Sequence, residues 1–333
     1  MKSLTRLPLE SIVGLYFISY IPNIILTRLA TSGVNAERGR PLTGLETLPV
    51  SLIINLLLTY AFIWASGWHR DAHRIQIGAA RLPVPTRYTA LSGIGTALVL
   101  FTVPLSFTFT NVSIPFIQLL MRGDILLIAP LVDFIFGRRV RWWSWTALII
   151  VAIALTFVVH QRGGFRLPPL AIATVVLYTL GYFLRLAVMT RISKSGDAAS
   201  VRGYFVEEKL IALPMSVVAL AAISWMGLGS QAGELSWGFT RAWSDPVFLL
   251  LAGGGFTLTI ISVFAAIILL DPRENSYCVP LERSSSLLAG LAAAFVLHAV
   301  WGQSAPAGSE LIGASLLLAA IVLLTLAPRF ARK

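Results

Sequence analysis

Long apolar stretches alternate with short polar ones along nearly the whole chain. A helix needs about 20 apolar residues to cross about 30 Å of hydrocarbon, because each residue adds 1.5 Å. Ten stretches reach that length. The pattern therefore predicts an all-α integral membrane protein with ten transmembrane helices, at residues 10–28, 48–66, 89–109, 112–136, 143–160, 168–189, 204–226, 247–270, 276–300 and 309–327.

The composition excludes a water-soluble protein. Of the 333 residues, 56% are hydrophobic and 12% are charged, and the mean hydropathy is +0.80, which lies far outside the usual range of soluble domains. The longest polar segments, Arg28–Thr47 and Gly67–Tyr88, are too short to fold as a separate domain. Cys278 is the single cysteine, which excludes an intrachain disulfide and a cysteine-rich metal site.

The net charge of +11 is explained by the loops rather than by nucleic-acid binding. If the N-terminus is cytoplasmic, the inside segments carry most of the basic residues, as the positive-inside rule requires. We therefore expect both termini in the cytoplasm and the chain in a bacterial inner membrane. The expected partners are the bilayer and a small molecule, and contacts with anionic lipids or a second copy are left open. The inside segments carry Lys2, Arg6, Arg70, Arg74, Arg81, Arg87, Arg138, Arg139, Arg141, Arg191, Lys194, Arg202, Arg273, Arg329, Arg332 and Lys333.

Two regions of the chain share one pattern. Residues 112–159 and 275–324 each contain an apolar run, a short turn and a second apolar run. An offset of 165 residues places Pro115 on Pro280 and Gly137 on Gly302. The predicted orientation makes the two regions cross the membrane in opposite directions. The sequence thus predicts two inverted five-helix repeats, 1–165 and 166–333, an arrangement that holds substrate near the midplane between the halves.

The two regions also resemble a known family. They read PFIQLLMRGDILLIAPLVDFIFGRRVRWWSWTALIIVAIALT and VPLERSSSLLAGLAAAFVLHAVWGQSAPAGSELIGASLLL, and they are similar to the two halves of the drug/metabolite transporter superfamily. The resemblance is to its ten-helix EamA-like members and to their nucleotide-sugar and triose-phosphate relatives. The likeness lies in the proline of the first helix and the glycine before the turn. Many members have a glutamate in the first turn, where this chain has Gly137, Arg138 and Arg139.

The first candidate residues lie in the predicted span 112–136. Gln118, Arg122 and Asp133 share one helical face, whereas Asp124 lies about 200° round from Arg122. Charges at membrane depth are costly unless they face a partner or water. We expect Arg122, with Gln118, to bind the anionic head of a substrate, and Asp124 and Asp133 to serve in a gate or in ion coupling. The alternative is a structural ion pair between helices.

A second group of charges comes from three other predicted helices. Its carboxylates could neutralise its cations as an inner gate, and a buried Glu208 or Glu282 could carry a coupling proton. Alternatively, Glu207 to Lys209 are solvated at the inner interface. The group consists of Arg185, Glu207, Glu208, Lys209, Glu282 and Arg283.

Aromatic residues recur at helical spacing near these charges. Tyr178, Tyr182 and Arg185 follow one another at i, i+4 and i+7, which places them on one face. Such a stripe can line a substrate site, and packing is the more common alternative. The small residues of helix 276–300 are interpreted as sites of close helix packing, with hydroxyls exposed at a pore as the alternative. Gly253 to Gly255 are interpreted as permitting either a bend or a close helix contact.

The resemblance and the intramembrane charges together predict a secondary active transporter, not an enzyme. Its substrate would be a small polar or anionic metabolite, and a proton or ion gradient, or exchange, would drive it, since no nucleotide-binding motif is present. We expect no cofactor and no metal. Two alternatives stay open: a flippase for a lipid-linked or phosphorylated substrate, and a membrane-embedded lipid-modifying enzyme.

Overall fold

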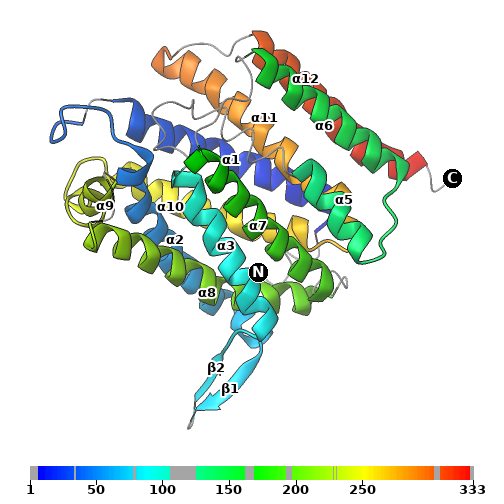
Figure 1. Ribbon diagram of the computed structural model, residues 1–333, viewed down its shortest axis with the longest axis horizontal. Coiled ribbons are helices and arrows are strands. Elements are labelled where there is room, and N and C mark those ends of the chain that lie inside the picture. Colours follow the sequence, from blue (N-terminus) through cyan, green and yellow to red (C-terminus); the bar gives the residue numbers. More distant parts are fainter. Residues whose placement is uncertain are drawn as a thin grey trace.

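The computed structural model describes residues 7–33, 35–77, 80–105, 125–161, 169–192, 197–227, 229, 231–303 and 308–330. Within these ranges the protein is all-α apart from one two-stranded hairpin (Figure 1). The elements are α1 (Leu9–Ser32), α2 (Gly44–Ser66), the 3₁₀ helix η2 (Trp68–Arg70), β1 (Arg74–Ile77), β2 (Ala80–Pro83), α3 (Arg87–Leu105), α5 (Ile125–Ile135), α6 (Trp142–Gln161), α7 (Pro169–Ile192), α8 (Ala198–Trp225), α9 (Ala232–Phe239), the 3₁₀ helix η4 (Arg241–Trp243), α10 (Phe248–Leu269), α11 (Asn275–Trp301) and α12 (Gly308–Phe330).

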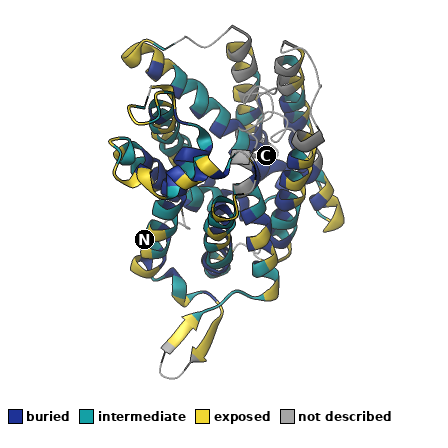
Figure 2. Ribbon diagram, turned by 60° about the vertical axis from the view of Figure 1, so that its left-hand side comes forward, coloured by how far each residue is buried: buried dark blue, intermediate teal, exposed yellow. Residues whose placement is uncertain are grey.

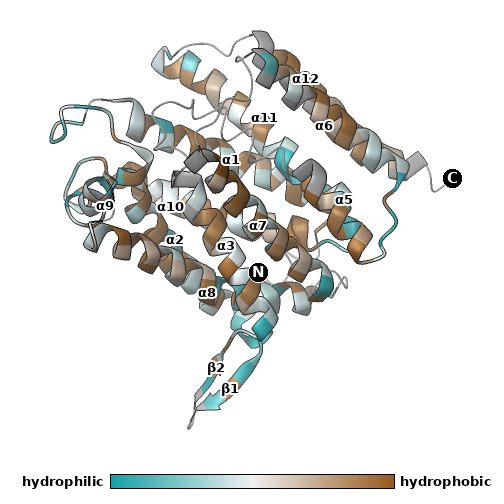
Figure 3. Ribbon diagram, in the orientation of Figure 1, coloured by the Kyte–Doolittle hydropathy of each residue, from teal (hydrophilic) through white to brown (hydrophobic). Residues whose placement is uncertain are grey.

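Each predicted apolar stretch contains a helix. Five helices in the described part of the chain are long and apolar enough to cross a membrane: α1, α2, α7 from Ile172 onward, α10 and α11. Of the predicted span 112–136, only α5 is described. The prediction of ten spans stays a prediction. Figure 3 shows the apolar residues concentrated on the helices and the polar ones in the hairpin and in the connections.

The helices are arranged in groups that mix the two halves of the sequence. Helix α3 packs against α7 and α8, while α10 packs against α1 and α2. Helices α6 and α12 lie side by side at one edge of the molecule (Figure 1), and α5 packs against α11. Helices from the first and second halves are thus neighbours throughout, so the halves do not form separate lobes.

Glycines allow the closest of these contacts. A Cβ on Gly95 of α3 would lie 2.6 Å from the carbonyl oxygen of Gly181 on α7, and one on Gly255 of α10 would lie 2.7 Å from the carbonyl oxygen of Ser51 on α2. Any side chain at these positions would separate the helices. Of the predicted glycines of α10, Gly255 is confirmed as a site of close contact, whereas a Cβ on Gly253 or Gly254 would lie no closer than 3.1 Å to side-chain atoms. Gly95 has the same role in α3.

Large apolar side chains also cover the outside of the bundle. Phe134, Trp225 and Leu249 are 82%, 91% and 77% exposed, and Figure 2 shows exposed positions along the outer faces of the helices. Contiguous apolar surface of this kind is unfavourable in water, whereas helices that satisfy their own backbone hydrogen bonds are stable in lipid. The exposed apolar surface and the five long apolar helices indicate a membrane protein.

The polar segment between α1 and α2 folds against α9 and η4. The Glu37 carboxylate accepts hydrogen bonds from Arg241 at 2.7 Å and from the Trp237 indole at 3.2 Å, and Asn35 donates to Asp245 at 2.9 Å. Helix α2 then begins at a capping box, in which Thr43 and Glu46 bond each other's backbone N–H groups. This capping box starts the helix four residues before the predicted apolar span.

Acid should loosen this segment. The hydrogen bond from Arg241 lowers the pKa of Glu37. A carboxyl whose pKa is lower in the folded protein contributes stability at neutral pH that is lost as the pH falls through that folded value. A spin label on Ala36→Cys, in a Cys278→Ser background, should therefore gain mobility only once the pH falls below the ordinary glutamate pKa of about 4.3. Arg241→Ala should make the label mobile at neutral pH, and Arg28→Ala should not. A label equally immobile at pH 3 and pH 7 would contradict this role for the ion pair.

Candidate functional site

Two buried groups of charged side chains lie inside the bundle. In the first, Arg185 of α7 donates from Nε to Oε1 of Glu208 on α8 at 2.6 Å. The Thr96 hydroxyl of α3 donates to the same oxygen at 2.6 Å, and Lys209 Nζ lies 3.6 Å from Oε2. The Glu208 side chain is fully buried. One carboxylate therefore faces two cations, and the group carries a net positive charge.

The second buried group belongs to α11, α1 and α7. Glu282 and Arg283 are neighbours in α11, with 3.1 Å between Oε2 and Nε. Tyr16 of α1 donates its hydroxyl hydrogen to Glu282 Oε1. Arg283 donates to the hydroxyl of Tyr178 at 3.2 Å, and its guanidinium lies 4.8 Å from the centre of the Tyr182 ring. A cation over a ring face is favourable, more so where water is excluded.

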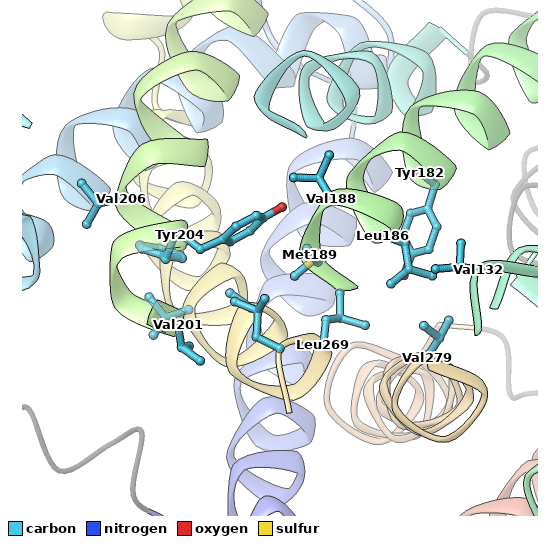
Figure 4. Close-up of a cluster of buried hydrophobic side chains, with 14 of the residues drawn as sticks. Val132, Tyr182, Leu186, Val188, Met189, Val201, Tyr204, Val206, Leu269 and Val279 are labelled. Carbon is cyan, nitrogen blue, oxygen red and sulfur yellow. The ribbon is translucent and has the colours of Figure 1, made fainter. Parts of the chain in front are cut away.

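The predicted stripe on α7 connects the two groups. The rings of Tyr178 and Tyr182 stack with their centres 6.2 Å apart, and both contact Arg283. One turn further along the same face, Arg185 pairs with Glu208. The predicted shared face of Tyr178, Tyr182 and Arg185 is confirmed as geometry. Figure 4 shows Tyr182 beside Val132 of α5 and Val279 of α11, with Tyr204 of α8 on the other side of the same hydrophobic cluster.

Several polar atoms of these groups have unused hydrogen-bonding capacity. They are fully buried and have no hydrogen-bond partner within the described ranges. Most buried polar atoms in proteins are satisfied, and an unsatisfied one costs about 1–3 kcal/mol. They are the Tyr182 hydroxyl, Glu208 Oε2, Glu282 Oε2 and Arg283 Nε. Glu282 Oε2 and Arg283 Nε still face each other at 3.1 Å as an ion pair, and Glu208 Oε2 lies 3.6 Å from Lys209 Nζ. The Tyr182 hydroxyl has neither kind of partner in the described structure, so it is the atom best placed to form a hydrogen bond with water or a ligand.

Glu207 is buried but takes part in neither group. It accepts hydrogen bonds from the backbone N–H groups of His73 at 2.8 Å and Thr86 at 3.2 Å, and from the Thr89 hydroxyl at 2.7 Å. The alternative that Glu207 to Lys209 are solvated is wrong, because all three are less than 10% exposed. Glu207 holds the polar segment 67–88 onto α8.

Asp133 lies apart from both charge groups and caps α11. Its carboxylate accepts from the backbone N–H groups of Asn275 at 2.9 Å and Ser276 at 2.7 Å, and from their side chains at 2.8 Å and 2.7 Å. Helix α11 receives no capping hydrogen bond from the side chain of its own N-cap residue, Glu274. Asp133 supplies the missing acceptor from another helix. This contact favours a structural role, although one of hydrogen bonding rather than ion pairing.

The other predicted residues of this region, Gln118, Arg122 and Asp124, lie outside the described residues. Their predicted roles remain untested. In the part of the chain that the structure describes, no three His, Cys, Asp or Glu side chains are placed to hold a metal ion. Asp71, which lies between His69 and His73 in the sequence, pairs with Arg202 at 2.7 Å.

Sequence reasoning did not select Thr96, the hydroxyl donor to Glu208, or Tyr16 as the partner of Glu282. Tyr16 belongs to a second aromatic stripe at helical spacing, with Tyr20 and Asn23, which provided a weak signal. Thr96 provided none, because a single threonine in an apolar helix is common.

Comparisons with known proteins identify the fold and no family. No family model matches the chain, and no curated protein matches it. Solved structures do match, among them one described only as "Crystal structure of protein". That structure has a TM-score of 0.63 and 16% sequence identity, over 97% of this chain and 99% of the other. At that identity the match shows a shared fold over nearly the full length of both proteins and says nothing about activity.

Proposed function

We propose that this protein is a secondary transporter that moves a small polar or anionic metabolite across the membrane by alternating access. The observation that carries the proposal is the pair of buried, incompletely satisfied charge groups on α7, α8 and α11. Burying ion pairs seldom stabilises a protein more than apolar packing does. Charged side chains retained inside an apolar bundle are therefore expected to serve a function.

Ten spans in two inverted halves are part of this proposal. The proposed repeat pairs α3 with α10, α7 with α1, and α8 with α2. In the structure, α3 packs against α7 and α8, and its counterpart α10 packs against the counterparts α1 and α2. Gly137 after α5 and Gly302 after α11, matched by the sequence offset, both adopt left-handed φ angles of 63° and 65°. Both observations support the repeat. They also favour the proposed relationship to the drug/metabolite transporter superfamily.

The two arginines are the proposed anchors of the substrate. A carboxylate or phosphate can be bound bidentately by a guanidinium, and it would compete with Glu208 for Arg185 or with Glu282 for Arg283. A proton taken up by either glutamate would release its arginine. This competition supplies a physical basis for coupling transport to a proton gradient or to exchange of one anion for another. Gln118 and Arg122 remain proposed contributors.

Uptake into proteoliposomes tests the proposal. A panel of amino acids, nucleotide sugars, phosphorylated sugars and carboxylates would be offered to the reconstituted protein with and without a pH gradient. We expect saturable uptake of one class. Recovery of a chemically altered substrate would instead support an enzyme, and movement of a lipid-linked compound alone would support a flippase.

Tyr182→Phe is expected to separate transport from folding. Its hydroxyl has no hydrogen-bond partner in the described structure, so its removal should leave the melting temperature in detergent nearly unchanged, while uptake falls at least tenfold. The matched control is Tyr277→Phe. The Tyr277 hydroxyl accepts a hydrogen bond from Arg273 at 3.1 Å, outside both charge groups, so its loss should cost about 1 kcal/mol of stability and spare uptake. Full uptake by Tyr182→Phe would remove Tyr182 from the site.

A further inference from the structure

Strands β1 and β2 form an arm that leaves the bundle at the ends of α2, α3 and α8. In Figure 1 the arm points down and to the left, across the direction of long helices such as α6 and α12, and in Figure 2 it extends below the bundle with its described residues mostly exposed. If the long helices cross a bilayer, an element that runs across them at their ends lies along the membrane surface. The arm consists of residues 74–83.

The two faces of the arm differ in chemistry. The antiparallel register places Ile75 opposite Leu82, and Gln76 opposite Arg81. Side chains alternate between faces along a strand, so Ile75 and Leu82 share one face, and Arg74, Gln76 and Arg81 share the other. Ile75 and Leu82 are 42% and 41% exposed. An isolated two-stranded hairpin with an exposed apolar pair has no core of its own to cover that pair.

The base of the arm is fixed to the bundle. Asp71 accepts from Arg202 at 2.7 Å, and the Glu207 carboxylate accepts from the backbones of His73 and Thr86 on the two sides of the arm. Gly203 brings α8 so close that a Cβ there would lie 2.5 Å from the Asp71 carbonyl oxygen. The helices therefore set the direction in which the arm points.

The arm is basic, and Asp71 at its base already pairs with Arg202. Residues 72–86 contain no Asp or Glu, and Arg70 and Arg87 flank the arm on its two sides. Both flanking arginines are exposed, as are Arg74 and Arg81. Exposed basic side chains beside a membrane are attracted to anionic lipid, and the attraction fades within a Debye length.

We propose that the arm rests on the cytoplasmic surface of the bilayer and binds anionic phospholipid. Ile75 and Leu82 enter the boundary between headgroups and acyl chains, while the arginines meet lipid phosphates at headgroup level. Amphipathic helices at membrane surfaces have the same division of faces. The proposal rests on the proposed membrane orientation of the bundle, and it does not depend on the substrate or on transport itself.

Paired labels on neighbouring residues test the proposal. Ile75→Cys and Gln76→Cys would each be made in a Cys278→Ser background and labelled with an environment-sensitive fluorophore. The full-length protein would be reconstituted in vesicles of phosphatidylcholine, with or without phosphatidylglycerol. Collisional quenching by lipids carrying a spin label near the headgroup measures contact with the bilayer. Gln76→Cys is the matched control because it differs from Ile75→Cys only in the face of the strand.

In vesicles that contain phosphatidylglycerol, we expect quenching at position 75 to exceed that at position 76 severalfold. The difference should shrink in pure phosphatidylcholine and at 1 M salt, where the Debye length falls to about 3 Å. Equal quenching at both positions, or a difference independent of lipid charge, would overturn the proposal. If the shielding of position 75 instead increases with the protein-to-lipid ratio, a second copy of the protein covers this face, and the proposal is overturned as well. Failure of the transport assay would contradict the proposed function but not the proposed contact of the arm with lipid, because quenching is measured without any substrate.

Discussion

Replacing Glu208 by alanine is expected to lower the free energy of unfolding by about 3–5 kcal/mol, because the Arg185 guanidinium would remain charged and unpaired inside the bundle. The side chains of Glu208 and Arg185 are 0% and 12% exposed, with 2.6 Å between Glu208 Oε1 and Arg185 Nε. Lys209, which is also buried, would lose its only nearby carboxylate in the described structure. Titration with SDS in mixed micelles, followed by circular dichroism, measures the loss.

The double variant Arg185→Leu/Glu208→Leu separates stability from function. Removing both charges of a buried pair is often neutral or stabilising, so we expect the double variant to regain most of the stability that Glu208→Ala loses. Uptake should nevertheless be lost in the double variant, because the proposed anion anchor, Arg185, is gone. Arg241→Ala is the surface control: Arg241 is 70% exposed in its ion pair with Glu37, and such pairs contribute about 0–1 kcal/mol. A double variant that transports normally would exclude the pair from the mechanism.

The second large effect is expected at Asp133. Replacing Asp133 by alanine removes an acceptor of four hydrogen bonds and leaves the first N–H groups of α11 buried without a partner. Hydrogen bonds to charged groups contribute about 1.5–3 kcal/mol each, and partial rearrangement leads us to expect a net loss of about 3 kcal/mol. Asp197→Ala, which removes the exposed cap of α8, should cost less and serves as the matched control.

Asp133→Asn distinguishes a cap from a coupling residue. An asparagine presents an NH₂ group to backbone N–H donors, so two donors would face each other. If Asp133 is a cap, the asparagine variant should lose nearly as much stability as the alanine variant. If Asp133 carries a coupling proton, the asparagine resembles the protonated acid, and the protein should keep its stability and lose only its coupling. The same denaturation and uptake measurements decide between the two outcomes.

The sequence predicted the helices well because apolar length is a strong local signal. The ends were less accurate, since they depend on single polar residues: α2 begins at Gly44 because Thr43 and Glu46 form a capping box. The hairpin in the polar segment 67–88 was not predicted. Its strands have four residues each, too few for alternation to stand out from a polar loop.

Partners across the bundle could not be predicted from the sequence. Arg185, Glu208 and Glu282 were identified because charges are rare in apolar helices. Their actual contacts depend on helix packing: Tyr16 and Glu282 are separated by 266 positions along the chain. The sequence analysis assigned Asp133 to a gate or to ion coupling because it is a carboxylate within an apolar predicted span. Only the approach of the first turn of α11 shows that its carboxylate is fully used as a cap.

The contacts between backbones at Gly95 and Gly255 determine which parts of the protein can move. A helix whose main chain touches another main chain cannot rotate or slide against it without a steric clash, so α3 with α7, and α10 with α2, should each move as a rigid body. Contacts made through side chains are more adaptable, as between α2 and α8, where Leu52 and Leu220 belong to the same apolar cluster. Any change of shape that opens the bundle first to one side of the membrane and then to the other should therefore keep each of these two pairs together and be taken up where helices meet through side chains.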